Sequence, residues 1–202
     1  VFVLNFQYHN CNVVLYNHPM PEYRRVIIKG GVYFFTIVTY ERQKIFLLPE
    51  VRALFSDSLD HIQKYHPFIV IAYCILPDHV HFIWQMPEND ANYSMRISQI
   101  KRRFSMRYIL QFGTNFPKTE SRQKRREVMV WQRRFWEHYI RDEEDLNKHI
   151  DYIHYNPVKH GVVDVVRDWN ASSFHDYVRQ GYYELDWGEE YEDEVKPYQF
   201  GD

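Results

Sequence analysis

Four stretches of the chain are rich in β-branched and aromatic residues and are bounded by Gly, Pro or polar breaks, a pattern that predicts β-strands. They comprise residues 32–40, 68–76, 79–86 and 128–140, the last with room for a break near Gln132. Only Pro77 and Asp78 separate the second stretch from the third. Strands joined by so short a turn pair antiparallel, so we expect an antiparallel sheet.

Apolar residues recur at helical spacing in three other segments. The first begins at Pro49 and ends before Pro67. The second covers residues 92–110, and its core-facing positions are Ile97, Ile100, Phe104 and Tyr108. The third follows the last strand and should end at Asn156 or just beyond, because Pro157 comes next. The order β-α-β-β-α-β plus a further C-terminal helix predicts an α+β fold: a ferredoxin-like (RRM-like) split βαβ whose antiparallel sheet carries helices on one face.

Two stripes of residues run along this third helix. Its N-terminus can be capped by Asp142. The apolar stripe that should pack on the sheet consists of Leu146, Ile150 and Ile153. A second stripe, offset by roughly a quarter turn, consists of Asp145, His149, Tyr152 and Asn156. A tyrosine on a helix is usually a core or rim residue, so this stripe alone does not establish a functional site.

The predicted third strand carries two histidines in the run LPDHVHFIW, residues 76–84. Side chains alternate along a strand, so His79 and His81 share one face while Val80 and Phe82 point to the other. Two interpretations stay open at this stage. The pair is either two polar residues on a half-exposed face, or two imidazole ligands of a divalent transition ion that needs at least a third ligand.

Composition limits the class of protein. With 202 residues and 45% hydrophobic content, the chain can form one domain with a sizeable core. Two cysteines, Cys11 and Cys74, supply neither a disulfide framework nor a thiolate metal site, so a reducing cytoplasm is the simplest location. No run approaches the roughly 18 apolar residues needed to cross a bilayer, and polar interruptions early in the chain argue against a signal peptide. We treat residues 1–20 as an N-terminal extension.

Charge is distributed unevenly, although the net charge is only −2. Residues 96–134 contain twelve Lys and Arg but two Glu, whereas residues 182–202 contain eight acidic residues and one Lys. The basic segment suits either a surface for nucleic-acid phosphates or a solvated helix face followed by a charged loop. The acidic tail, residues 188–202, is expected to be a solvated terminus; the opposite charges also suggest that it folds back over the basic groove.

Three runs, YRRVIIKGG, LPDHVHFIW and RFWEHYIRDEEDLNKHIDYIHYNPVKHG, closely resemble the REP-associated tyrosine transposases of the HUH single-tyrosine nuclease superfamily. The resemblance covers residues 21–187, which we treat as an HUH tyrosine transposase domain. It implies a ferredoxin-like protein that binds and cuts single-stranded DNA at the hairpins of repetitive extragenic palindromes (REPs), beside a guide tetranucleotide. It also implies a monomer that works in the cytoplasm, associated with the nucleoid.

Carried over by motif, the resemblance makes Tyr152 the nucleophile, on a C-terminal catalytic helix, and makes His79, His81 and Asn156 the ligands of a divalent metal ion, Mg²⁺ or Mn²⁺. Tyr152 would form a 5′-phosphotyrosine and release a 3′-hydroxyl. Related insertion-sequence transposases carry glutamine where this chain has Asn156. Tyr155 is a rival nucleophile, but it lies about 100° from Asn156 around the helix, so Tyr152 is preferred.

The candidates for DNA binding are Tyr23, Arg24, Arg25, Lys29, Lys101, Arg102, Arg103, Arg107, Arg122, Lys124, Arg125 and Arg126. Such cations contact phosphate without reading sequence, whereas the resemblance implies that the YRR segment helps to read the guide bases. His149 could assist proton transfer or be an ordinary surface histidine, and Glu137 and His138 should point to opposite sides of a strand. Two other functions stay open: a protein that binds DNA hairpins without cutting them, and a hydrolytic metalloenzyme that uses water as its nucleophile on a small substrate.

Overall fold

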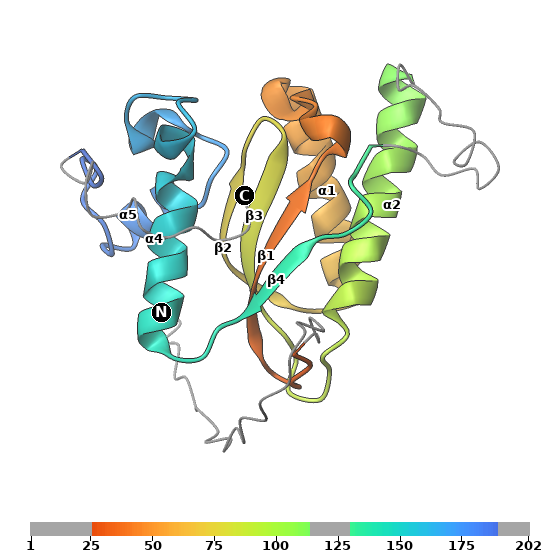
Figure 1. The fold of residues 1–202 in the computed structure, drawn as a ribbon, viewed down its shortest axis with the longest axis horizontal. Helices are drawn as coiled ribbons and strands as arrows, with labels where there is room; N and C mark the ends of the chain where they lie inside the picture. Colours follow the sequence, from red (N-terminus) through yellow and green to blue (C-terminus); the bar gives the residue numbers. More distant parts are fainter. Residues whose placement is uncertain (1–25, 114–129, 190–202) are drawn as a thin grey trace, which may run out of the picture.

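The computed structural model describes residues 26–113 and 130–189, and the predictions for residues 1–25, 114–129 and 190–202 lie outside these ranges (Figure 1). The strands are β1 (Val32–Val38), β2 (Ile69–Ile75), β3 (His79–Gln85) and β4 (Trp136–Tyr139). The α-helices are α1 (Pro49–Tyr65), α2 (Tyr93–Phe112), α4 (Glu143–Lys159) and α5 (Phe174–Arg179). Short 3-10 helices cover Tyr40–Arg42, Ile45–Leu47 and Val166–Asp168.

The four strands form one antiparallel sheet in the order β2-β3-β1-β4, which confirms the predicted ferredoxin-like α+β fold. Strand β1 lies between β3 and β4, and its register places Thr36 opposite His81 and Phe34 opposite His138. Residues from all three strands therefore meet on the same face of the sheet.

The fourth strand is shorter than predicted. The sequence pattern indicated a strand over residues 128–140, but only Trp136–Tyr139 is regular, and Trp131 makes an isolated bridge with Thr39. The residues between them, 132–134, are Gln-Arg-Arg and are all exposed. Three consecutive long polar side chains have no apolar residue to pack on either layer of helices, so the chain leaves the sheet there.

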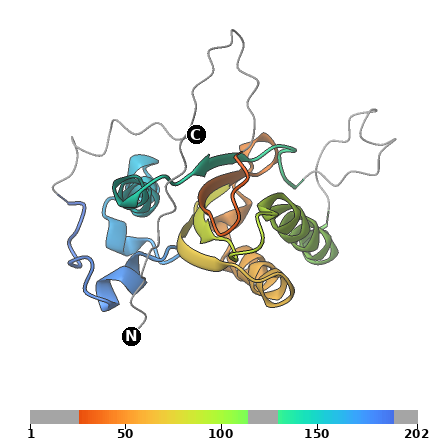
Figure 2. The ribbon, with the colours of Figure 1, turned by 90° about the horizontal axis from the view of Figure 1, so that it is seen from below.

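Helices cover both faces of the sheet. Helices α1 and α2 lie on one face and α4 lies on the other, as the view along the sheet shows (Figure 2). Val80, Phe82 and Trp84 of β3 join the core under α1 and α2, which also contains the predicted core positions Ile97 and Ile100. The predicted layer of helices on one face is confirmed for α1 and α2, and the additional C-terminal helix α4 closes the opposite face.

Helix α4 follows the predicted pattern closely. The carboxylate of Asp142 accepts a hydrogen bond of 2.8 Å from the backbone N–H of Asp145, which confirms the predicted N-cap. Leu146, Ile150 and Ile153 pack in one cluster with sheet residues such as Phe34 and Ile83. The apolar stripe therefore fixes which side of α4 faces the sheet.

The helix also extends one turn past Asn156, and Pro157 lies inside it. Proline removes one intrahelical hydrogen bond, but the next turn is held by the N–H of His160, which donates to the Asn156 carbonyl at 3.0 Å. This extra turn carries Lys159 back to the side of the helix on which Tyr152 lies, because seven residues make about two turns.

Within the described ranges, no helix is both long and apolar enough to cross a membrane.

The contact between α4 and the sheet should be a main source of stability. Ile153 is fully buried, so Ile153→Ala should lower the free energy of unfolding by about 2–5 kcal/mol through lost burial and a residual cavity. Leu110, on α2, is 89% exposed, so Leu110→Ala should change the free energy of unfolding by less than about 0.5 kcal/mol. Urea unfolding followed by circular dichroism measures both; equal losses in the two variants would show that α4 is not packed as described.

Candidate active site

The two histidines of β3 face α4 and are buried. His79 is 2% exposed and His81 is 0% exposed, so the interpretation as polar residues on a half-exposed face is wrong. Their ring centroids lie 4.7 Å apart, and the His81 ring lies 5.4 Å from the Tyr152 ring on α4. Alternation along β3 and the apolar stripe of α4 together bring the paired imidazoles to the tyrosine.

Each histidine is oriented by a neighbour at its Nδ1 atom. Asp78 Oδ1 lies 2.5 Å from His79 Nδ1, and Thr36 Oγ1 lies 2.9 Å from His81 Nδ1. A carboxylate accepts only, so His79 Nδ1 is the donor in this contact and Nε2 is the ring nitrogen that remains for another partner. That Nε2 atom is buried and has no hydrogen-bond partner among the described residues. An imidazole held in this way is arranged as a metal ligand is.

The pKa values of Asp78 and His81 are both lowered. Burial alone would raise the pKa of Asp78, but its hydrogen bond to His79 and the nearby Arg42 lower the pKa below its usual value, so the carboxylate stays ionised. Burial holds the pKa of His81 well below its usual value, and the charges of His79, His160 and Lys159 act in the same direction. His81 is therefore a neutral imidazole, the form that binds a metal ion.

Tyr152 and Asn156 lie one turn apart on α4, and both are buried. The Asn156 side chain donates from Nδ2 to the Tyr152 carbonyl at 3.2 Å. Its Oδ1 atom is buried, and the Asn156 side chain interacts with the His81 imidazole. The rival Tyr155 packs in a separate cluster with Val166 and Phe174. Of the two tyrosines, Tyr152 is the one that lies against the histidine pair.

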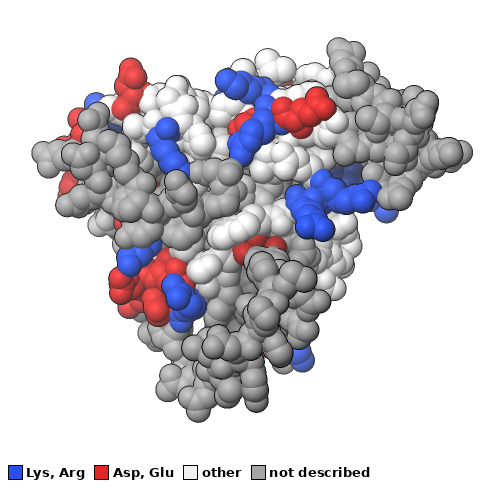
Figure 3. Space-filling view, viewed as in Figure 1, with Lys and Arg blue, Asp and Glu red and all other residues white. Residues whose placement is uncertain are grey.

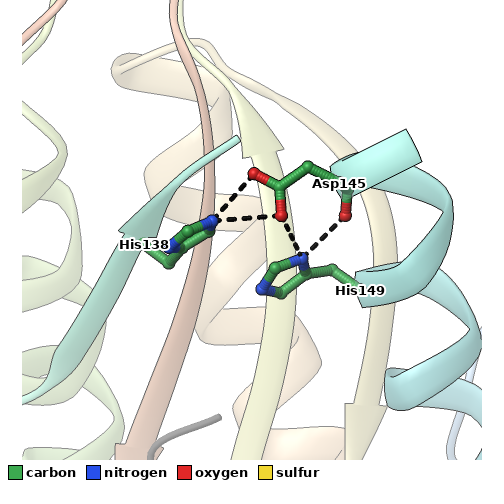
Figure 4. Close-up of side chains that lie close together, drawn as sticks. All are labelled: His138, Asp145 and His149. Atoms are coloured by element: carbon green, nitrogen blue, oxygen red, sulfur yellow. Dashed lines mark hydrogen bonds and ion pairs between the residues drawn. The ribbon is translucent and has the colours of Figure 1, made fainter. Parts of the chain in front are cut away.

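A second cluster of histidines and a carboxylate joins β4 to the first turn of α4 (Figure 4). His138 Nε2 donates to both Asp145 oxygens, at 2.9 and 3.2 Å, and His149 Nδ1 donates to the Asp145 carbonyl at 2.7 Å. One ligand atom from each of the three residues lies within 4.8 Å of the others, a spacing compatible with a metal ion. The Asp145 carboxylate also accepts from the backbone and the guanidinium of Arg141, each at 3.1 Å.

The hydrogen bonds of this cluster stabilise a charged Asp145. Burial raises the pKa of Asp145, but hydrogen bonds from His138 and Arg141 outweigh burial, and the pKa lies below its usual value. His149 is 0% exposed, so its interpretation as a surface histidine is wrong. The predicted alternation of Glu137 and His138 is confirmed by the register, because Glu137 pairs with Phe35 and His138 pairs with Phe34.

The described DNA-binding candidates fall into two groups. Lys29 and Arg102 are exposed. Arg103 and Arg107 form ion pairs with Asp57 of α1, and Lys101 donates to the Gln132 carbonyl at 2.6 Å. Burial lowers the pKa of Lys101 to about 8. The seven remaining candidates, Tyr23, Arg24, Arg25, Arg122, Lys124, Arg125 and Arg126, lie outside the described residues.

Lys and Arg side chains gather beside α2 on the face seen in Figure 3. The exposed residues of this region include Arg133 and Arg134, which precede β4 and adjoin the end of the Lys101 side chain. Both residues belong to the basic segment of residues 96–134 but are not among the predicted DNA contacts; the sequence pattern predicted a strand there. Their exposure follows from the late start of β4, at Trp136.

Two residues at the end of α4 also lie at the site, although they were not among the site residues predicted from the sequence. The Lys159 ammonium donates to the Tyr152 hydroxyl at 3.3 Å, and the His160 ring lies 5.1 Å from the His79 ring. Lys159 and His160 are both exposed, so they mark where the site meets solvent. The NPVKHG run was noted as a motif, but its helical conformation was needed to place Lys159 on the side of Tyr152.

Fold and site together describe a ferredoxin-like protein in which a helical tyrosine faces a buried histidine pair. The family described as "Transposase IS200 like" matches residues 27–156. The chain is 49% identical to a protein of Haemophilus influenzae over 84% of this chain and 94% of that protein, and 39% identical to one of Escherichia coli K12 over 83% and 91%. Both relatives are named as REP-associated tyrosine transposases.

A solved structure gives the same result. It is titled as the REP-associated tyrosine transposase bound to a REP hairpin, and it aligns with a TM-score of 0.72 at 36% identity over 91% of this chain and 98% of its own. The chain therefore belongs to the IS200-like transposases and, among them, to the REP-associated tyrosine transposases.

The buried His149 should make stability depend on pH. Burial lowers its pKa to about 4, so between about pH 6.5 and 4 the unfolded chain binds a proton that the folded chain does not. Stability should fall as the pH falls through this window, by up to about 1.4 kcal/mol per pH unit for this residue. Urea unfolding in EDTA measures this dependence, and His149→Asn should flatten it. If the free energy of unfolding of this variant changed with pH as steeply as that of the wild-type protein, the His149 ring would be exposed to solvent.

Proposed function

We propose that this protein is a metal-dependent endonuclease and strand transferase that cuts single-stranded DNA at REP hairpins through a 5′-phosphotyrosine. The observation that supports this most strongly is the separation of 5.4 Å between the Tyr152 and His81 rings within one chain. A nucleophile and a candidate metal site thus adjoin each other without a second subunit. This arrangement supports a monomer as the active unit.

The residues present fit a divalent ion. His79, His81 and Asn156 would hold Mg²⁺ or Mn²⁺. The support for this set is the buried His79 Nε2 atom, which lacks a hydrogen-bond partner among the described residues, and the buried Asn156 side chain, which interacts with His81. When bound, the ion supplies charge that polarises the scissile phosphate and stabilises the transition state. The His138–Asp145–His149 cluster is the weaker candidate, because the Asp145 oxygens already accept hydrogen bonds from Arg141 and His138.

Tyr152 would carry out the covalent step. Its phenol oxygen attacks phosphorus while the bond from phosphorus to the 3′ oxygen breaks, so the fragment downstream of the break stays linked to tyrosine through its 5′ phosphate. The phenol proton passes to solvent, and the departing 3′ oxygen takes up a proton to become a hydroxyl. One phosphodiester replaces another, so the reverse step needs no ATP. Attack by the 3′-hydroxyl of the same strand restores the DNA, and attack by the 3′-hydroxyl of another strand is strand transfer. A phenol has an ordinary pKa near 10, so it needs a nearby cation to attack at neutral pH.

The substrate assignment rests on the relatives and on charge. The solved relative is bound to a REP hairpin, and the exposed Arg102, Arg133 and Arg134 beside α2 suit the phosphates of such a hairpin. Reading of a guide tetranucleotide is assigned to Tyr23, Arg24 and Arg25 by family resemblance alone. A protein acting on chromosomal repeats would work in the cytoplasm, at the nucleoid.

Removal of the nucleophile tests the reaction. Tyr152→Phe should reduce covalent adduct formation with labelled hairpin DNA and Mn²⁺ by at least about 10³-fold while affinity for the DNA is retained. Tyr155→Phe is the matched control and should cut at close to the wild-type rate. Denaturing gels report the adduct and fluorescence anisotropy reports the affinity.

The outcome also separates the alternatives. A wild-type protein that binds the hairpin but forms no adduct would be a non-cleaving hairpin-binding protein. Metal-dependent hydrolysis that survives Tyr152→Phe would indicate water as the nucleophile. Either result contradicts the proposed function.

Metal binding distinguishes the two histidine clusters. Mn²⁺ at about 100 times its Kd should stabilise the protein by about 2.7 kcal/mol, a shift of several degrees in Tm. His81→Gln should abolish this shift, and His138→Gln should keep it, each compared with the same variant in EDTA. Loss of the Tm shift in His138→Gln alone would show that the ion binds at the His138–Asp145–His149 cluster instead.

A further inference from the structure

Lys159 lies against the tyrosine from the exposed end of α4. Its ammonium nitrogen is 3.3 Å from the Tyr152 hydroxyl and 4.7 Å from the centre of the Tyr152 ring. Tyr152 itself is 1% exposed, whereas Lys159 is an exposed residue. A cation at the surface thus reaches the one atom of the buried tyrosine that would attack DNA.

This contact is more specific than simple packing of a lysine stem on an aromatic ring. A cation over the ring face would suffice for a stabilising cation–π contact. Here the same ammonium also donates to the hydroxyl, so it fixes where the phenol oxygen lies as well as the plane of the ring. The helical spacing of seven residues holds both groups on one side of α4.

Lys159 also lies where the site meets solvent. His160 follows Lys159, is exposed, and places its ring 5.1 Å from the ring of buried His79. A phosphate placed between the histidine pair and the Tyr152 hydroxyl would therefore lie within reach of the end of α4. An ammonium group has three N–H bonds, so it can donate to the hydroxyl and to a phosphate oxygen together.

We propose that Lys159 binds a non-bridging oxygen of the scissile phosphate and orients the Tyr152 hydroxyl toward the phosphorus. This inference rests on the proposed function. Lys159 keeps its protons throughout and transfers none of them; it contributes position and positive charge where negative charge develops on the phosphate. A lysine suits this task as a compact point charge on a flexible stem.

Three variants test the role. Lys159→Met removes the charge but keeps most of the stem, Lys159→Arg keeps the charge, and Lys148→Met is the matched control on the same helix, where Lys148 pairs with Glu144. With saturating hairpin DNA and Mn²⁺, Lys159→Met should form the Tyr152 adduct about 10²-fold more slowly. Lys159→Arg should recover most of this loss, and Lys148→Met should match the wild-type protein.

A second measurement excludes a merely structural role. In the Tyr152→Phe background the hydroxyl contact is gone, yet adding Lys159→Met should still weaken hairpin affinity several-fold, because the phosphate contact is lost. Unchanged affinity there, or a Lys159→Met rate within about threefold of wild type, contradicts the inference while leaving the proposed function intact. A wild-type protein that forms no adduct contradicts the proposed function, and the inference fails with it.

Discussion

The packing of α4 on the open face of the sheet is the interaction on which the rest of the structure depends. Ile150 and Ile153 bury their side chains against β1, β2 and β3, and this contact sets the rotation of the helix. Once the rotation is fixed, Tyr152 must lie beside His81. A rotation of about 100°, one residue along the helix, would direct Tyr152 away from the histidines.

Polar anchors at the two ends of α4 reinforce this packing. At the first turn, Asp145 accepts hydrogen bonds from His138 of β4 and from Arg141, so the start of the helix is tied to the sheet. At the last turn, Lys159 donates to the Tyr152 hydroxyl. A site that combines groups from a strand and a helix needs such support, because small displacements of a nucleophile reduce rates strongly.

Much of this arrangement was predictable from the sequence. Alternation in LPDHVHFIW placed both histidines on one face, and the apolar stripe of α4 predicted its packing on the sheet. The family resemblance supplied the pairing of His79 and His81 with Tyr152 and Asn156. Burial was not predictable: His149 was compatible with the surface because periodicity alone does not show how deeply a helix edge is covered. The late start of β4, which exposes Arg133, and the helical turn after Pro157, which places Lys159, depend on tertiary contacts that propensity does not encode.

The proposed function depends on attack of the Tyr152 phenol on DNA beside the histidine pair. It is tested most directly by trapping the complex formed with hairpin DNA and Mn²⁺, digesting it, and locating the DNA fragment by mass spectrometry. We expect a single modified peptide that carries the 5′-phosphate of the fragment on Tyr152. A fragment attached to Tyr155 or to any other residue, or attached through its 3′ end, would contradict it.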